Sequence, residues 1–180
     1  MRPTGEGPAA RVAAGIEALI DGAGRLTLWL ALAMISLVAI NVLLRYSLSL
    51  GSVWAQELEW HLLAAMIMLG MSHALQRGDD VRVDLFYARF GPATKWWVDL
   101  VSLLLLLAIA AILTKLSLPY VAQAWAIGER SNDPGGIPWR WAVKSLIPIG
   151  FGLIALHAVA AILRLVARRP AVATVEAGRG

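Results

Sequence analysis

Cysteine is absent from the 180-residue chain, and charged residues are scarce. Without a thiol the protein can form no disulfide, no thiolate metal site and no iron–sulfur cluster, and it has no cysteine nucleophile. Only 16% of its residues are charged, against about 25% in soluble domains, whereas 59% belong to the group AVILMFWYC. Because so little polar surface cannot cover a globule in water, the composition predicts an integral membrane protein. In that class a net charge of +4 reflects cytoplasmic loops, and we expect no nucleic-acid partner.

Charge is missing altogether from four long stretches of the chain. A helix that crosses the hydrocarbon of a bilayer needs about 20 predominantly apolar residues. Residues 26–44, 60–76, 100–114 and 145–163 contain no Asp, Glu, Lys or Arg. Extended to their flanking polar and aromatic residues, these stretches predict transmembrane helices at about 26–46, 54–76, 96–116 and 138–166. The four helices form a transmembrane domain over residues 26–168.

The segments outside the spans are expected to add short interfacial helices. In residues 1–25, Val12, Ile16, Leu19 and Ile20 recur at helical spacing, which predicts a helix lying on the membrane surface in a cytoplasmic arm; a flexible Ala/Gly-rich arm is the alternative. Residues 81–90 mix apolar and charged side chains before Gly91-Pro92 and predict a second such helix. Beyond residue 116 a helical continuation is expected to be interrupted near Pro119, and residues 169–180 are interpreted as a disordered cytoplasmic tail. The fold class is therefore an all-α integral membrane protein.

The distribution of basic residues predicts the orientation of these helices. Most of the 16 lysines and arginines lie in the N-terminal arm, between the second and third spans, and in the C-terminal tail. Fewer lie in the two opposite connections: Arg45, Lys115, Arg130, Arg140 and Lys144. Because cytoplasmic loops are enriched in Lys and Arg, both termini are expected in the cytoplasm.

All eight tryptophans lie near predicted span ends, where amphipathic indole rings are favoured. They support the expected contact with the lipid bilayer. The residues taken as interfacial anchors are Trp29, Trp54, Trp96, Trp97, Trp139 and Trp141.

Ionisable groups at mid-bilayer would mark a substrate path or a proton relay, because they are costly there. No span carries one at its centre, and no inverted repeats or matched broken helices indicate a midplane site. Four helices of this kind are not expected to transport a solute by themselves. A small self-contained homo-oligomeric carrier remains an alternative that solute uptake by the isolated chain would establish.

The three histidines suggest a second alternative, a haem- or quinone-binding membrane anchor subunit of a dehydrogenase. His61 and His73 lie on one predicted helix, about 18 Å apart along its axis, so they cannot share an iron. His73 and His157 lie in the same half of the membrane and could pair across helices, although a hydrogen bond between packed helices is the more usual role. No Ser/His/Asp arrangement, HExxH spacing or phosphate-binding loop is present, so we expect no enzyme and no cofactor.

Several charged residues near the span ends are expected to make ion pairs or to contact another subunit. Arg45 ends the first span on the side with few basic residues, and Glu57 and Glu59 open the second span at the same depth. An Arg45–Glu57 pair is the structural hypothesis; an arginine reaching into the lipid headgroups is the alternative. Arg82 and Asp84 either form a solvated interfacial face or dock another subunit. Small residues in the helices either contact a partner or pack the helices of this chain together: Ala64, Ala65, Gly150 and Gly152.

The order of several short motifs resembles one known family. Asn41-Val42-Leu43-Leu44-Arg45-Tyr46 is followed by Trp54-Ala55-Gln56-Glu57-Leu58, by Gly70, and by Arg77-Gly78-Asp79-Asp80-Val81-Arg82-Val83-Asp84; Gly136-Ile137-Pro138 comes later. Over roughly residues 20–166 the chain is similar to the small, DctQ-like membrane subunit of tripartite ATP-independent periplasmic (TRAP) transporters. Two departures are Gln56, at the first acidic position of the W-x-E-E pattern, and Asp80, where His is common.

The resemblance implies a non-catalytic accessory subunit in a bacterial inner membrane. In such systems a periplasmic substrate-binding protein delivers an organic acid to a large membrane subunit of about twelve helices, which imports it by secondary transport driven by the sodium gradient. The small subunit would brace the scaffold of the large one. The outer segment around Tyr120–Trp141 would help to receive the binding protein.

Overall fold

The computed structural model describes residues 7–78, 87 and 89–177, and its four main elements are helices. They are α1 (Pro8–Leu48), α2 (Val53–Arg77), α4 (Pro92–Ala126) and α5 (Arg140–Ala177). No strand occurs in the described ranges. All four helices are long and apolar enough to cross a membrane, so the predicted all-α membrane fold with four spanning helices is confirmed.

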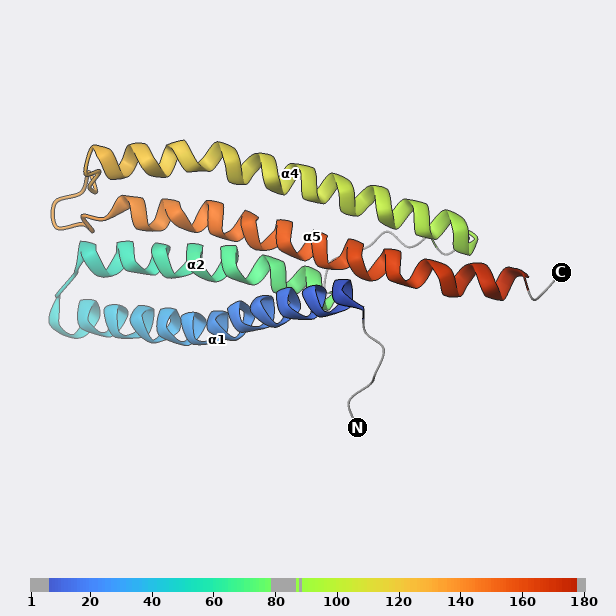
Figure 1. Cartoon of the computed structure of the whole chain (residues 1–180). Coiled ribbons are helices and arrows are strands. Elements are labelled where there is room, and N and C mark those ends of the chain that lie inside the picture. Colours follow the sequence, from blue (N-terminus) through green and yellow to red (C-terminus); the bar gives the residue numbers. More distant parts are fainter. Residues whose placement is uncertain (1–6, 79–86, 88, 178–180) are drawn as a thin grey trace.

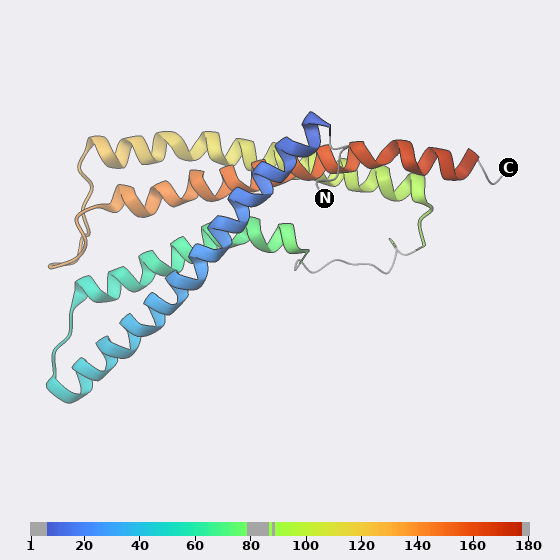
Figure 2. The same cartoon turned by 60° about the horizontal axis from the view of Figure 1, so that its bottom comes forward.

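The helices lie side by side in the order α4, α5, α2, α1 (Figure 1). The connections α1–α2 and α4–α5 lie at one end of the bundle, which we call the loop end. The first turns of α1 and the last turns of α5 lie toward the other end, which we call the termini end (Figure 1). In Figure 2, α1 runs obliquely to the other helices, and its first turns cross over α5, which it contacts.

The N-terminal arm is part of the first long helix and not a separate interfacial helix. Helix α1 continues without a break for 41 residues from Pro8, and Ala13, Ile20 and Gly24 on one of its faces are buried. No proline separates residues 8–25 from the first span, and the buried face packs on the bundle. Residues 8–25 thus pack on α2 and α5 as the beginning of α1, where the sequence predicted a separate short helix on the membrane surface.

The bounds of the other helices differ from expectation mainly at prolines. Helix α4 begins at Pro92, four residues before the predicted start at 96, passes through Pro119 and ends only at Ala126. Helix α5 begins at Arg140, two residues after Pro138, and extends to Ala177, where a disordered tail was expected. Spanning helices tolerate proline when neighbouring helices support the freed backbone groups, and α4 packs along α5. The second predicted interfacial helix, residues 81–90, lies mostly outside the described residues.

Small residues form most of the interior, while large apolar side chains point outward. The buried apolar residues include Ala13, Ala110, Ala124, Ala158 and Ala160. A lipid solvent gives large apolar side chains no reason to turn inward, so close helix contact depends on small residues. A Cβ added at Gly150 of α5 would lie 2.8 Å from the backbone oxygen of Met68 in α2, so Gly150 packs helices within the subunit. A Cβ at Gly152 would meet nothing within 4 Å.

Gly150→Ala should lower the stability of the isolated subunit, because the added methyl group forces α5 away from α2. Overpacking of this kind costs about 1–3 kcal/mol. Thermal unfolding in detergent, followed by circular dichroism, measures the change. Gly152→Ala is the matched control, and it should leave the melting temperature unchanged or raise it, since Ala is the better helix former. Equal melting temperatures for the two variants would contradict the close α2–α5 approach.

Candidate functional site

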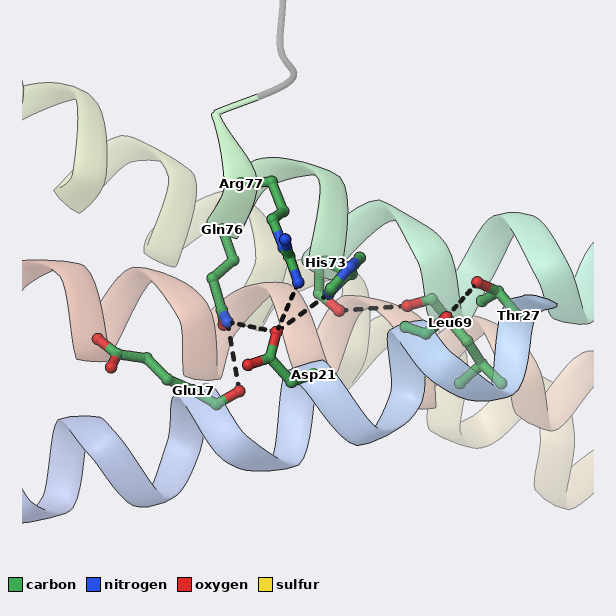
Figure 3. Close-up of polar contacts among 9 residues, drawn as sticks. Glu17, Asp21, Thr27, Leu69, His73, Gln76 and Arg77 are labelled. Atoms are coloured by element: carbon green, nitrogen blue, oxygen red, sulfur yellow. Dashed lines mark hydrogen bonds and ion pairs between the residues drawn. The ribbon is translucent and has the colours of Figure 1, made fainter.

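Acidic side chains of α1 meet polar side chains of α2 at the termini end (Figure 3), and Glu17 also meets Arg164 of α5. The Asp21 carboxylate accepts a hydrogen bond of 3.1 Å from Gln76 Nε2 and lies 3.9 Å from Arg77 Nη2. The Glu17 carboxylate receives two bonds from Arg164 of α5, at 3.0 and 2.9 Å. Glu17, Asp21, His73, Gln76, Arg77 and Arg164 form what we call the termini-end cluster. It ties three helices together with charges that lie outside the apolar spans.

The tightest helix contact in this cluster joins His73 to Gly24. A Cβ added at Gly24 would lie 2.3 Å from Cγ of His73, so the imidazole lies directly against the backbone of α1. The Nδ1 atom of this ring is 3.4 Å from Oδ1 of Asp21. One turn on, Gly70 of α2 leaves ordinary contact distance for the Thr27 side chain, 3.5 Å from its ideal Cβ position. Gly24 thus lets α1 and α2 approach closely, whereas a Cβ would fit at Gly70.

A third helix pair is fixed at the same end of the bundle. The Tyr87 hydroxyl donates to the Asp99 carboxylate of α4, with oxygen–oxygen distances of 2.9 and 3.0 Å. Trp96 Nε1 donates to the backbone oxygen of Leu165 in α5 at 3.3 Å. These bonds hold the beginning of α4 against the segment before it and against α5.

At the loop end, Glu57 of α2 binds the connection between α4 and α5. Its carboxylate accepts a hydrogen bond from the Ser131 hydroxyl and one of 2.5 Å from the Ile137 amide, and it lies 4.0 Å from Arg140 Nη2. A Cβ at Gly136 would lie 2.8 Å from Oε1 of Glu57, so only glycine fits beside this carboxylate. We call Glu57, Ser131, Gly136, Ile137 and Arg140 the loop-end cluster.

The same connection is tied to its own flanking helices. Lys144 of α5 pairs with Glu129 at 2.5 Å and lies 3.9 Å from the centre of the Tyr120 ring. The Arg140 amide donates to the Glu129 backbone oxygen at 3.3 Å, which explains why α5 begins two residues after Pro138. Trp125 and Trp141 pack edge to face at 4.6 Å. Side chains of α4 and α5 thus hold the connection at its two ends, and Glu57 of α2 binds its middle.

The comparison with known families assigns this bundle. The family described as "Tripartite ATP-independent periplasmic transporters, DctQ component" matches residues 34–168, three quarters of the chain. The chain belongs to this family. It is a DctQ component, the small membrane component of a TRAP transporter, a system that also contains a large membrane component and a periplasmic binding protein. A comparison with curated proteins finds no match. Because the family is a transporter component, the dehydrogenase-anchor alternative is not retained.

The DctQ component places its predicted ion-pair residues differently from the hypothesis. No ion pair joins Arg45 to Glu57 or Glu59 in the described part of the chain, since Glu57 belongs to the loop-end cluster. Glu59 accepts a bond of 3.0 Å from the amide of Asn41, a buried residue of α1. Arg45 lies exposed in the last turn of α1. Glu57 therefore joins α2 to the α4–α5 connection, and Glu59 joins α2 to α1. Neither of these two glutamates pairs with Arg45.

The other predicted residues divide into two groups. Arg82 and Asp84 lie outside the described residues. Trp29, Trp54, Trp97 and Trp139 of the DctQ component are exposed on the surface of the subunit. Trp96 and Trp141 are half-buried and also pack within the subunit.

Sequence reasoning missed both clusters as such. Glu17 and Asp21 stand four residues apart, which places them on one face of a helix, and no role was predicted for them. Their partners come from α2 and α5, far away in the chain, and nothing in the spacing indicates them. The motif Gly136-Ile137-Pro138 of the resemblance did point to the loop-end cluster, although only the fold shows that it holds Glu57.

Both clusters in the DctQ component position helices relative to one another. Each carboxylate accepts bonds from groups of the same chain, and no set of three or more His, Asp or Glu that could hold a metal occurs among residues 7–78, 87 and 89–167. Charged hydrogen bonds at the ends of spanning helices fix the tilt and rotation of each helix relative to the next.

Glu57→Gln in the DctQ component should loosen the α4–α5 connection, because a neutral amide binds the Ser131 hydroxyl and Ile137 amide less strongly. Hydrogen bonds to a charged carboxylate are stronger than those to a neutral amide oxygen, so the connection then opens more often. Limited trypsin digestion after the exposed Arg130 measures the opening, and cleavage should become roughly tenfold faster. Glu59→Gln is the control, because Glu59 contacts Asn41 and not the connection. Equal cleavage rates in both variants would refute the role of Glu57.

Gly24→Ala should destabilise the DctQ component through collision with the His73 ring, whereas Gly22→Ala, with open space around it, should not. In a His73→Ala background the cost of Gly24→Ala should largely disappear. The four melting temperatures form a double-mutant cycle, with an expected coupling of about 1–3 kcal/mol. Additive effects of the two substitutions would mean that the ring does not lie on Gly24.

Proposed function

We propose that this DctQ component is a non-catalytic brace for the large membrane component of a sodium-coupled, binding-protein-dependent importer of organic acids. The observation that carries the proposal is the position of its charges. In the described helices, the paired carboxylates and cations lie at the two ends of the bundle, and the four stretches between them carry no formal charge. Such a chain supplies no charged side chain at mid-membrane that could bind a carboxylate or a sodium ion.

Rigidity is the second support. The termini-end cluster links α1, α2 and α5, and the loop-end cluster links α2 to the connection that leads into α5. The Gly24 contact with His73 adds to the termini-end cluster, and Gly150 brings α5 against α2 between the two ends. A bundle fixed at both ends suits an element against which another protein moves. The motion, the substrate and the sodium ions then belong to the large component.

The orientation follows from the basic residues. With the positive-inside rule, the termini end faces the cytoplasm, and the loop end faces the periplasm of a bacterial inner membrane. The connection held by Glu57 then lies on the side from which a binding protein would deliver the substrate. Its exposed side chains include Trp139 and Arg130.

Copurification tests this proposal. The DctQ component, tagged at one terminus and coexpressed with a large TRAP membrane component encoded beside it, should retain that component in detergent. Proteoliposomes containing both components and the binding protein should take up a radiolabelled carboxylate from a panel of organic acids when an inward sodium gradient is imposed. Proteoliposomes with the DctQ component alone should show no uptake. Uptake by the isolated chain would overturn the proposal, as would complete activity of the large component without it.

A further inference from the structure

The connection between α1 and α2 differs in composition from the other connection at the loop end. Residues 46–56 carry no formal charge, whereas the α4–α5 connection contains Glu129, Arg130 and Asp133. Apolar side chains that are exposed together mark a surface that contacts protein or membrane, since water does not favour them. The α4–α5 connection therefore suits water, and the α1–α2 connection does not. We call its large side chains, with the arginine that precedes them, the α1–α2 tip: Arg45, Tyr46, Leu48, Leu50, Val53 and Trp54.

The α1–α2 tip is exposed in every direction. All residues from 42 to 54 are exposed, and the last two turns of α1 belong to this run, so no side of the helix is covered there. The exposed fraction is 84% for Tyr46, 61% for Leu48 and 59% for Leu50. In Figure 2 the tip stands apart from the α4–α5 connection. A protein docked on one side would leave the other sides in water, whereas lipid surrounds the tip completely.

The length of the uncharged part of α1 places the tip at the depth of the lipid headgroups. Arg25 and Arg45 enclose residues 26–44, and at 1.5 Å per residue they lie about 30 Å apart along the helix. The hydrocarbon core of a bilayer is also about 30 Å thick, so Arg45 lies at its border. A tilt of α1 only draws the tip closer to the hydrocarbon. Tyrosine and tryptophan rings, such as those of Tyr46 and Trp54, are favoured at this depth.

Arg45 is the only charged residue of the tip, and its side chain lies beside the connection. A Cβ added at Gly51 would be 4.0 Å from Nε of Arg45. The nearest carboxylates in the sequence have other partners, because Glu57 binds the α4–α5 connection and Glu59 binds α1. No described side chain forms an ion pair with Arg45. Its guanidinium therefore offers its donors to the surroundings, where the phosphate of a lipid headgroup is the matching anion.

We propose that the α1–α2 tip binds a phospholipid, with Arg45 holding the phosphate group. Tyr46 and Trp54 then lie among the neighbouring headgroups, and Leu48 and Leu50 contact the upper parts of the acyl chains. The ligand is the phosphate with acyl chains that all phospholipids share, so the headgroup alcohol does not decide binding. This contact holds the end of α1 at a fixed depth in the membrane, whichever protein the subunit braces.

Fluorescence quenching measures the depth of the tip in liposomes of phosphatidylethanolamine and phosphatidylglycerol. Because the chain contains no cysteine, Leu50→Cys gives a single site for a bimane label. Asn132→Cys is the matched control, since Asn132 is also exposed but lies on the charged α4–α5 connection. Lipids with a nitroxide near the top of the acyl chain should quench the label at position 50 several-fold more than the label at position 132. Iodide, present on both sides of the membrane, should quench the two labels in the reverse order.

Two results of this experiment would overturn the lipid contact. One is equal quenching of both labels by iodide, which would place the tip in water. The other is the loss of lipid quenching at position 50 when the large membrane component is reconstituted with the subunit, because a protein surface would then cover the tip.

Arg45→Gln tests the phosphate contact separately. In native mass spectrometry of the purified subunit, half-maximal retention of added phosphatidylglycerol should need a several-fold higher lipid concentration for Arg45→Gln than for the unsubstituted chain. Arg45→Lys should restore part of the retention, because an ammonium also binds phosphate, although as a point charge. Arg130→Gln, which removes an exposed arginine of the α4–α5 connection, is the control and should retain the lipid like the unsubstituted chain.

A glycolipid with the same acyl chains and no phosphate completes this test, and all four proteins should retain it equally. Equal retention of phosphatidylglycerol by Arg45→Gln and the unsubstituted chain would refute the phosphate site at Arg45. A loss of glycolipid as large as the loss of phosphatidylglycerol would refute it as well.

Discussion

The exclusion of charge from the hydrocarbon governs the architecture of this protein. A charged side chain on a spanning helix must reach the interface or find a partner, and here it does so at two levels, one at each end of the bundle. Because every helix carries acidic or basic groups at its ends, the ion pairs and hydrogen bonds that satisfy them also connect elements that are distant in the chain. Glu17 with Arg164 and Glu57 with Ser131 and Ile137 are the clearest cases. The bundle is thereby fixed at its ends, while its middle relies on glycine and alanine contacts.

The properties that depend on local composition could be predicted. Four uncharged stretches specified four helices, and tryptophans and charged residues marked where they leave the membrane. The full lengths of α1 and α4 could not be predicted, because they depend on packing against α5. The first turns of α1 and the residues after Pro119 remain helical where neighbouring helices support them. Apolar periodicity describes a face without specifying whether lipid or protein covers it.

The partners of the charged residues were the least predictable feature. Arg45 and Glu57 lie close in the chain and at similar depth, but Glu57 binds a connection some 80 residues away, whereas the neighbouring Glu59 binds Asn41. Depth alone does not distinguish such alternatives, since rotation of α2 about its axis decides which carboxylate faces which helix. That rotation is fixed by contacts such as Gly150 with Met68 and Gly24 with His73. Because the chain belongs to the DctQ family, these contacts set the shape of a transporter component.

A distance measurement in the working transporter tests the central claim, that this component is a rigid brace. Spin labels at Leu50→Cys and Asn132→Cys, both exposed and on the two connections of the loop end, report how the α1–α2 pair sits relative to the α4–α5 pair. The distance distribution is recorded by pulsed electron paramagnetic resonance in the reconstituted complex, before and after addition of the binding protein, substrate and sodium. A rigid brace predicts one narrow distribution that stays the same. A second population, or a shift of the mean during transport, would contradict it.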